Sequence, residues 1–242
     1  QNGTEGLLPE FRRDFTSPLP TSEAYYHLGM INTAQRFTFE AMESIPNFNK
    51  SSRCFKRLAE TNLINGQYEV AAKYLRALRK TLFYKDWAEE AMTYLYDEEK
   101  INAHKEWGWL RQIRYTEDFL FSDREMDIML GLLYQHDHRN RMAFEYMLAY
   151  VLQQRDLERF MKYYPLGKHA GYDHIPRSYQ EALVYVWTQT HKNFQGMPWS
   201  ISPQVVRDVT EFARIYTSQQ NARQMLEARF GSTYWNYLLL RK

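Results

Sequence analysis

The chain has 242 residues, 44% hydrophobic and 25% charged, a composition that is sufficient for a folded core and excludes disorder over the whole chain. Its 31 basic and 29 acidic residues give a net charge of +2, too balanced for electrostatic binding of nucleic acid. Because no run of 18 apolar residues is present, no segment of this sequence is expected to span a membrane. Aromatic residues reach 16%, which suits both partly wet helix interfaces and binding surfaces for peptides or carbohydrates.

Helical spacing of apolar residues extends over almost the whole chain, and alternating strand patterns of useful length are missing. Residues 1–20 are the exception, because three prolines predict an extended lead-in. Short connections between the helices predict antiparallel neighbours. The first nine predicted helices span residues 21–32, 35–45, 51–64, 68–82, 85–96, 101–115, 123–135, 140–154 and 156–163. A loop at 166–175 precedes the next predicted helix, 176–190. A second loop at 191–200 precedes the last three, 202–216, 221–230 and 233–241.

Cys54 is the only cysteine, which excludes an intramolecular disulfide and a cysteine-based metal site. It stands between Arg53 and Phe55 in a helical stretch, and no histidine is near it in sequence. We therefore expect a small buried residue, with a reactive thiol as the alternative.

Three pairs of predicted helices share a pattern. A Leu and a small residue in the first helix precede an Ala in the second helix, which a large apolar residue follows four positions later. The small residues allow the two helices to approach closely, and the large ones fill the space between pairs. The members, pair by pair, are Leu28-Gly29 with Ala41 and Ile45, Leu58-Ala59 with Ala71 and Leu75, and Leu130-Gly131 with Ala143 and Met147.

On these positions, residues 21–190 resemble the tetratricopeptide (TPR) family. The resemblance implies an all-α, TPR-like α-α superhelix, which is a solenoid of antiparallel helix pairs. Residues 191–242 are expected to form a C-terminal helical cap within a single domain. The repeat length is not a constant 34, and the consensus Pro and Trp are missing, so an irregular helical bundle is the alternative.

The stretch from Ala24 to Trp87, around Ala34-Gln35-Arg36-Phe37 and residues 58–66, also resembles an uncharacterised bacterial family of membrane-anchored proteins with a soluble helical tail. The resemblance implies that this chain is such a tail, attached to the membrane by a segment outside this sequence. The chain begins with Gln1 rather than Met, which agrees with a processed or excised part of a longer protein. An extracytoplasmic, periplasmic location is the expectation.

TPR arrays bind an extended protein or peptide segment along a concave face that the first helix of each pair lines. The resemblance therefore implies concave-face positions here: Glu23, Tyr26, Met30, Arg53, Lys56, Glu60, Ile128, Leu132, Gln135 and His136. Some TPR domains clamp a terminal carboxylate with Lys and Asn. Lys56 matches the first, but Glu60 stands where Asn is needed, so this mode is not expected.

Patterns for catalysis and metal binding are missing, including His-Glu-x-x-His, Glu-x-x-His and Gly-x-Ser-x-Gly. We therefore predict no catalytic residue, no cofactor and no metal, and we interpret His136-Asp137-His138 as an exposed turn. The loop at 166–175 is the best alternative site, with His169, Asp173 and His174, because loops hold polar groups without burying them; a plain connector is the simpler interpretation.

The basic residues Arg76, Arg79, Lys80 and Lys85 are interpreted as a solvated helix face, with phosphate binding as the alternative. The whole sequence predicts a non-enzymatic module for binding or scaffolding proteins. A glycan-binding or enzyme domain that uses the aromatic surface, with Trp187 and Trp199 as stacking candidates, is the second hypothesis. A structural tail that organises a membrane partner or a homodimer is the third.

Overall fold

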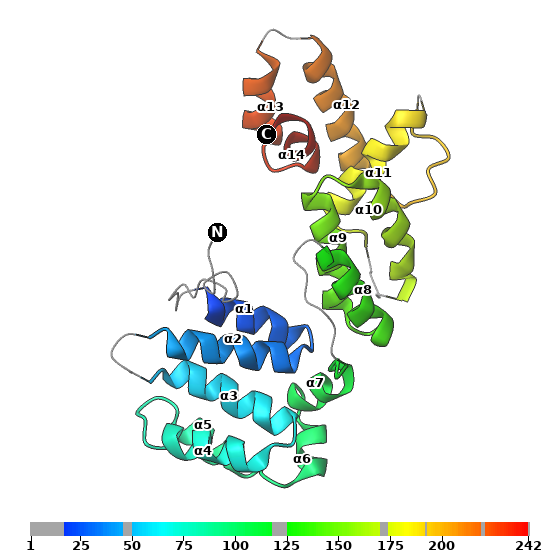
Figure 1. The fold of residues 1–242 in the computed structure, drawn as a ribbon. Coiled ribbons are helices and arrows are strands. Elements are labelled where there is room, and N and C mark those ends of the chain that lie inside the picture. The colour runs from blue at the N-terminus through cyan, green and yellow to red at the C-terminus, as the bar shows by residue number, and fades with distance from the viewer. Residues whose placement is uncertain are drawn as a thin grey trace, which may run out of the picture. The chain divides into compact units, whose positions relative to one another are not determined.

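All regular secondary structure that a computed structural model describes is helical (Figure 1), which confirms the predicted all-α class. The chain divides into two compact units, an N-terminal unit of residues 1–121 with 132–143 and a C-terminal unit of residues 122–131 with 144–242. None of the described helices is both long and apolar enough to cross a lipid bilayer. The described residues are 17–45, 50–117, 125–169, 174–191, 193–218 and 221–241.

Short helices follow one another closely along both units. The N-terminal unit contains α1 (Pro18–His27), α2 (Ile31–Glu43), α3 (Ser52–Ile64), α4 (Tyr68–Leu78), α5 (Lys85–Met92), α6 (Glu98–Ala103) and α7 (Trp107–Ile113). The next two helices, α8 (Met126–His136) and α9 (Arg141–Gln153), contribute residues to both units. The C-terminal unit continues with α10 (Leu157–Tyr163), the 3-10 helix η4 (Tyr164–His169), α11 (Arg177–Thr190), α12 (Pro203–Ser218), α13 (Ala222–Phe230) and α14 (Tyr234–Leu240).

Several predicted boundaries are wrong for local reasons. The first helix begins at Pro18 rather than residue 21, because proline in a first turn leaves no N–H without a partner. The lead-in prediction for residues 1–16 lies outside the described residues. The predicted helix 101–115 is two helices, since His104 is extended (φ −65°, ψ 128°) and its Nδ1 accepts from the Trp107 N–H at 3.1 Å. The predicted loop at 166–175 begins with residues of η4.

One turn geometry joins α1 to α2 and α3 to α4. Gly29 and Gly66 have φ angles of +81° and +74°, and the next residues, Met30 and Gln67, have φ/ψ of −87°/66° and −88°/64°. A left-handed residue at this place satisfies carbonyls at the helix end. The first pair was predicted in a different register: Gly29 corresponds to Gly66 in the turn, 37 residues on, rather than to Ala59 inside a helix.

Helix α3 is the central element of the N-terminal unit and packs against α2, α4 and α7 (Figure 1). Every residue from Arg57 to Ile64 is buried. The α3 carbonyls that lack intrahelical partners accept from α7 and the residue after it: Arg111 Nε donates to Ile64 O at 3.0 Å and Nη2 to Leu63 O at 3.0 Å, and Arg114 Nη1 donates to Ile64 O at 3.0 Å. Cys54 is buried on the same helix, as predicted.

In the C-terminal unit, α11 to α14 pack around one apolar cluster. The helices α12, α13 and α14 supply most of it, and Val184 of α11 joins it. Trp235 is 1% exposed and lies near Phe212, with ring centroids 5.9 Å apart. The remaining members are Val205, Val209, Ile215, Leu226 and Phe230.

Replacing the two turn glycines with alanine should cost different amounts of stability. At Gly66 the nearest atom to an added Cβ would be 4.0 Å away, so only the left-handed backbone is strained, at about 1 kcal/mol. At Gly29 the Cβ would lie 3.0 Å from Ile113 O and 3.2 Å from its Cγ1, which should raise the loss to about 2–3 kcal/mol. Urea unfolding of the two variants measures the difference, and equal losses would contradict the close approach of α7.

Candidate functional site

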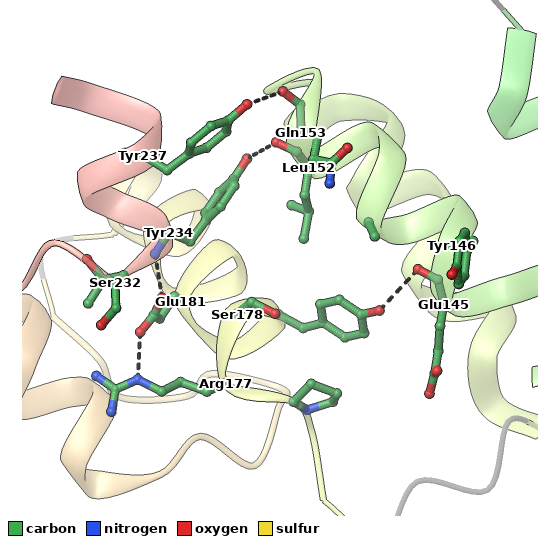
Figure 2. Close-up of a pocket in the computed structure, with 14 residues that line it drawn as sticks. Glu145, Tyr146, Leu152, Gln153, Arg177, Ser178, Glu181, Ser232, Tyr234 and Tyr237 are labelled. Atoms are coloured by element: carbon green, nitrogen blue, oxygen red, sulfur yellow. Dashed lines mark hydrogen bonds and ion pairs between the residues drawn. The ribbon is translucent and has the colours of Figure 1, made fainter. Parts of the chain in front are cut away.

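An open groove of about 760 Å³ lies in the C-terminal unit between α9, the start of α11 and the start of α14 (Figure 2). Four tyrosines line it, namely Tyr146, Tyr179, Tyr234 and Tyr237. Tyr146 is 46% exposed, whereas Tyr234 is 8% exposed. The volume falls within the usual range for ligand sites, and the tyrosine rings share its walls with polar and charged side chains.

The tyrosines of α14 are fixed by the end of α9 (Figure 2). Tyr234 Oη donates to Leu152 O at 3.1 Å, and Tyr237 Oη donates to Gln153 O at 2.6 Å. The last carbonyls of a helix have no intrahelical partners. Leu152 O also accepts from the Arg155 N–H at 3.0 Å, so Tyr234 adds a second donor there, whereas Tyr237 supplies the donor for Gln153 O. Burial raises the pKa of Tyr234 to about 12, which keeps its phenol protonated and able to donate.

Glu181 joins α11 to α14 at the floor of the groove and is 2% exposed. Its carboxylate accepts from Arg177 Nε at 2.8 Å and from the Tyr234 backbone N–H at 2.6 Å (Figure 2). Its carbonyl accepts from Trp235 Nε1 at 2.8 Å. Arg177 also donates to Asp208 of α12 at 2.8 Å. The buried charge is therefore paired and hydrogen-bonded, which makes the groove wall rigid.

The rim of the groove carries polar side chains that are available for a ligand. Gln153, Ser178 and Ser232 are exposed. Within the described part of the chain, none of these three side chains forms a hydrogen bond. An amide and two hydroxyls can donate and accept, so the rim can bind main-chain groups of a ligand whose apolar parts pack on the rings.

A second, smaller cavity of about 200 Å³ lies in the N-terminal unit and is lined by charged side chains. Arg57 forms an ion pair with Glu23 of α1 and a second one with Glu60 at 2.9 Å, and Lys56 binds Glu60. The Arg57 guanidinium also lies 3.5 Å from the centroid of the Tyr26 ring. Arg53 is exposed and has no ion pair with a described residue, so it is the cation of this cavity that is available to an anion.

The two carboxylates of this cavity have opposite pKa shifts. Burial raises the pKa of Glu60, although the charges of Arg57 and Lys56 act against it. Burial also acts to raise the pKa of Glu23, but hydrogen bonds and charges from Arg57 and His27 outweigh it and lower that pKa. Glu60 is 3% exposed, so its charge needs both cations to remain buried.

Comparison with known proteins assigns a family. Residues 1–241 match DUF6057, a family of unknown function. The chain belongs to this family. No curated protein and no solved structure matches it.

The structure of this DUF6057 chain brings part of the TPR-implied face together. Glu23, Arg53, Lys56 and Glu60 all line the charged cavity. Tyr26 and Met30, the other two implied residues of the first pair, are 0% and 7% exposed. Both residues lie next to the α1–α2 turn, whose register differs from the predicted one, so they face the core.

The four implied residues of α8 share an exposed face of that helix. Ile128 and Leu132 are 52% and 37% exposed, and Gln135 and His136 are exposed as well. The His136 ring meets Tyr115 edge to face, with centroids 5.4 Å apart. Among the described residues, no three His, Cys, Asp or Glu side chains are grouped as metal ligands.

The alternative loop site is only partly described. His174 is exposed, His169 ends η4, and Asp173 lies outside the described residues. The stacking candidates are engaged within the chain. The Trp187 ring stacks on His191 with centroids 3.6 Å apart, and Trp199 meets Trp187 edge to face at 6.2 Å.

Sequence reasoning missed the tyrosine groove. Tyr146 and Tyr237 are 91 residues apart, and no spacing rule connects them. The aromatic content of 16% was the one signal, but it does not say which rings converge.

The opposite pKa shifts predict opposite pH dependences of stability. A raised folded-state pKa means that the folded protein binds more protons at Glu60 than the unfolded chain does. Its contribution is therefore full below the ordinary value of 4.5 and falls as the pH rises through the raised pKa. Glu23 contributes stability above 4.5 that is lost as the pH falls through its lowered pKa.

Urea unfolding of wild type, Glu60→Gln and Glu23→Gln from about pH 7 to about pH 3.5 measures both effects. The free energy of unfolding of wild type should increase relative to Glu60→Gln as the pH falls towards 4.5. It should decrease relative to Glu23→Gln as the pH falls below 4.5. Parallel pH profiles for the two variants would refute the assignment.

Proposed function

We propose that this chain is a non-enzymatic interaction module whose tyrosine groove binds an extended peptide segment of a partner protein. The observation that supports the proposal is that the exposed ring of Tyr146 shares one groove with the rim side chains of Gln153, Ser178 and Ser232, which have no hydrogen-bond partner among the described residues. Tyrosine rings supply large contact areas at a low cost in conformational entropy. An extended peptide presents main-chain N–H and C=O groups that such rim groups can bind.

The chemistry of the walls favours apolar side chains in the peptide. Tyr146 supplies the most exposed ring of the groove, and Tyr237 of α14 extends the aromatic surface. Aromatic-lined grooves suit proline-containing segments because these are already extended before binding. We therefore expect bound peptides to contain Pro or Leu next to residues whose main-chain N–H and C=O groups form no hydrogen bonds within the peptide.

The proposal includes a TPR-like array of helix pairs. The repeated turn of Gly29-Met30 and Gly66-Gln67 supports it. The same backbone sequence recurs before α10, where Arg155 (φ 59°) precedes Asp156 (φ −87°, ψ 82°). Repetition of one turn between short helices is what a repeat architecture requires. The resemblance to membrane-anchored bacterial proteins supports a further part of the proposal, that the chain is the soluble part of a larger, membrane-associated protein.

Selection from a random peptide library on the immobilised full chain tests the proposal. Fluorescence anisotropy with the enriched peptides should give an affinity that Tyr146→Ala lowers about 10-fold or more, because truncating an aromatic anchor removes most of its contact energy. Tyr216→Ala is the matched control, since Tyr216 is 47% exposed but lies outside the groove, whereas Tyr146 is 46% exposed. This control should change the affinity less than about twofold.

Two outcomes would contradict the proposal. Either no peptide is enriched above background, or Tyr146→Ala and Tyr216→Ala weaken binding equally. A glycan array in parallel separates the second hypothesis: glycan binding that is lost on Tyr146→Ala, without peptide enrichment, would assign the groove to carbohydrate.

A further inference from the structure

The connection between α4 and α5 exposes two adjacent apolar side chains. Leu82 and Phe83 are each 88% exposed. Among the other large hydrophobic residues in the described ranges, the most exposed is Tyr96, at 62%. A folded chain rarely leaves two adjacent large apolar side chains in water unless they contact a partner.

Bonds within the connection keep this pair facing outward. Thr81 donates to Leu78 O from its backbone N–H at 2.9 Å and from its hydroxyl at 2.7 Å. Tyr84 is half-buried and lines the charged cavity, and its carbonyl accepts from the Ala88 N–H at 2.9 Å as α5 begins. The residues on both sides of the pair are therefore fixed, so Leu82 and Phe83 project from an ordered loop.

The segment that leads into the loop and through it carries cations that form no ion pairs with described residues, and the nearest acids in the sequence are Glu69 and Asp86. Residues 70–85 contain five basic and no acidic residues. All five are exposed, and none of their side chains makes a hydrogen bond or ion pair with a described residue. Two of them lie three residues apart on α4, a third is the residue that ends this helix, and two flank the apolar pair. They are Lys73, Arg76, Arg79, Lys80 and Lys85.

We propose that residues 79–85 dock the N-terminal unit on an anionic lipid bilayer, with Leu82 and Phe83 inserted among the lipids and the five cations against lipid phosphates. A protein partner would also cover apolar side chains. The charge argues for lipid, because a run of five cations without an acid complements a continuous negative surface. An apolar edge beside a basic face is the pattern of segments that lie at a membrane interface. The proposal takes up phosphate binding, the alternative interpretation of the basic residues, and it does not depend on the tyrosine groove.

Co-sedimentation of the full chain with vesicles tests the proposal, with phosphatidylcholine alone compared with phosphatidylcholine containing phosphatidylserine. Wild type should bind the anionic vesicles and release them at high salt. Leu82→Ala/Phe83→Ala should weaken binding about 10-fold or more. Arg79→Glu/Lys80→Glu should weaken it at least as much, because each cation near the surface contributes about fivefold.

Matched variants outside the loop show whether the loss of binding is specific to residues 79–85 or follows from any loss of exposed apolar side chains or positive charges. Leu166→Ala/Met225→Ala removes two side chains that are 53% and 43% exposed, and Lys162→Glu/Lys168→Glu reverses two exposed charges. Both controls should bind anionic vesicles like wild type. The proposal is overturned if wild type does not bind anionic vesicles, if it binds both vesicle types equally, or if the controls lose binding to the same extent.

A probe on the loop gives a second, independent readout. Cys54 is the only cysteine and is 1% exposed, so an environment-sensitive label attaches to the introduced thiol of Leu82→Cys. Its emission should shift to the blue on anionic vesicles and be quenched by lipid-phase quenchers, whereas a label at Lys162→Cys should not respond. Vesicle binding without a response at position 82 would overturn the insertion, and the loop would then belong to a protein contact.

Discussion

In both units, side chains from far along the chain donate to carbonyls at the C-terminal end of a helix. A helix leaves its last carbonyls without partners, and burying them unpaired costs free energy. In the N-terminal unit, Arg111 and Arg114 supply the donors for α3 from about 50 residues further along the chain. In the C-terminal unit, Tyr234 and Tyr237 supply them for α9 from more than 80 residues away. These long-range donors hold the surrounding helices in register.

The two candidate sites follow from this solution. Because α14 reaches α9 through tyrosines, their rings remain as the wall of a groove after their hydroxyls are engaged. Because α3 is buried along Arg57 to Ile64, its own charges need partners, and the charged cavity forms where Glu23 of α1 reaches Arg57. In the groove the tyrosine hydroxyls bond to α9 and the rings line the wall. At the cavity, Arg53 stays exposed and forms no ion pair with a described residue.

Sequence patterns predicted the elements that depend on local chemistry. The predicted helices 51–64 and 140–154 agree with α3 and α9 within one residue at each end, since the spacing of apolar residues acts over one or two turns. The TPR-like spacing also selected Glu23, Arg53, Lys56 and Glu60, which line one cavity. The TPR-like spacing placed Gly29 in a helix rather than in a turn, because a Leu-Gly pair fits both places. The residue that packs against this turn, Ile113, lies 84 residues further along the chain. The groove was not predicted for the same reason, since the residues that line it are far apart in the sequence and come together only in the folded chain.

The distance along the chain between α9 and α14 sets the order in which the protein can form during synthesis. Helices α1 to α7 find their main partners within about 60 residues, so they can pack while the ribosome is still elongating. The tyrosine groove requires contacts between residues 82 and 84 positions apart, and pairings of that kind form slowly. A nascent chain in which residues 232–237 are still inside the ribosome therefore has no groove. The apolar side chains of α11 and α12 in the cluster stay uncovered by α14 until Trp235 packs against them.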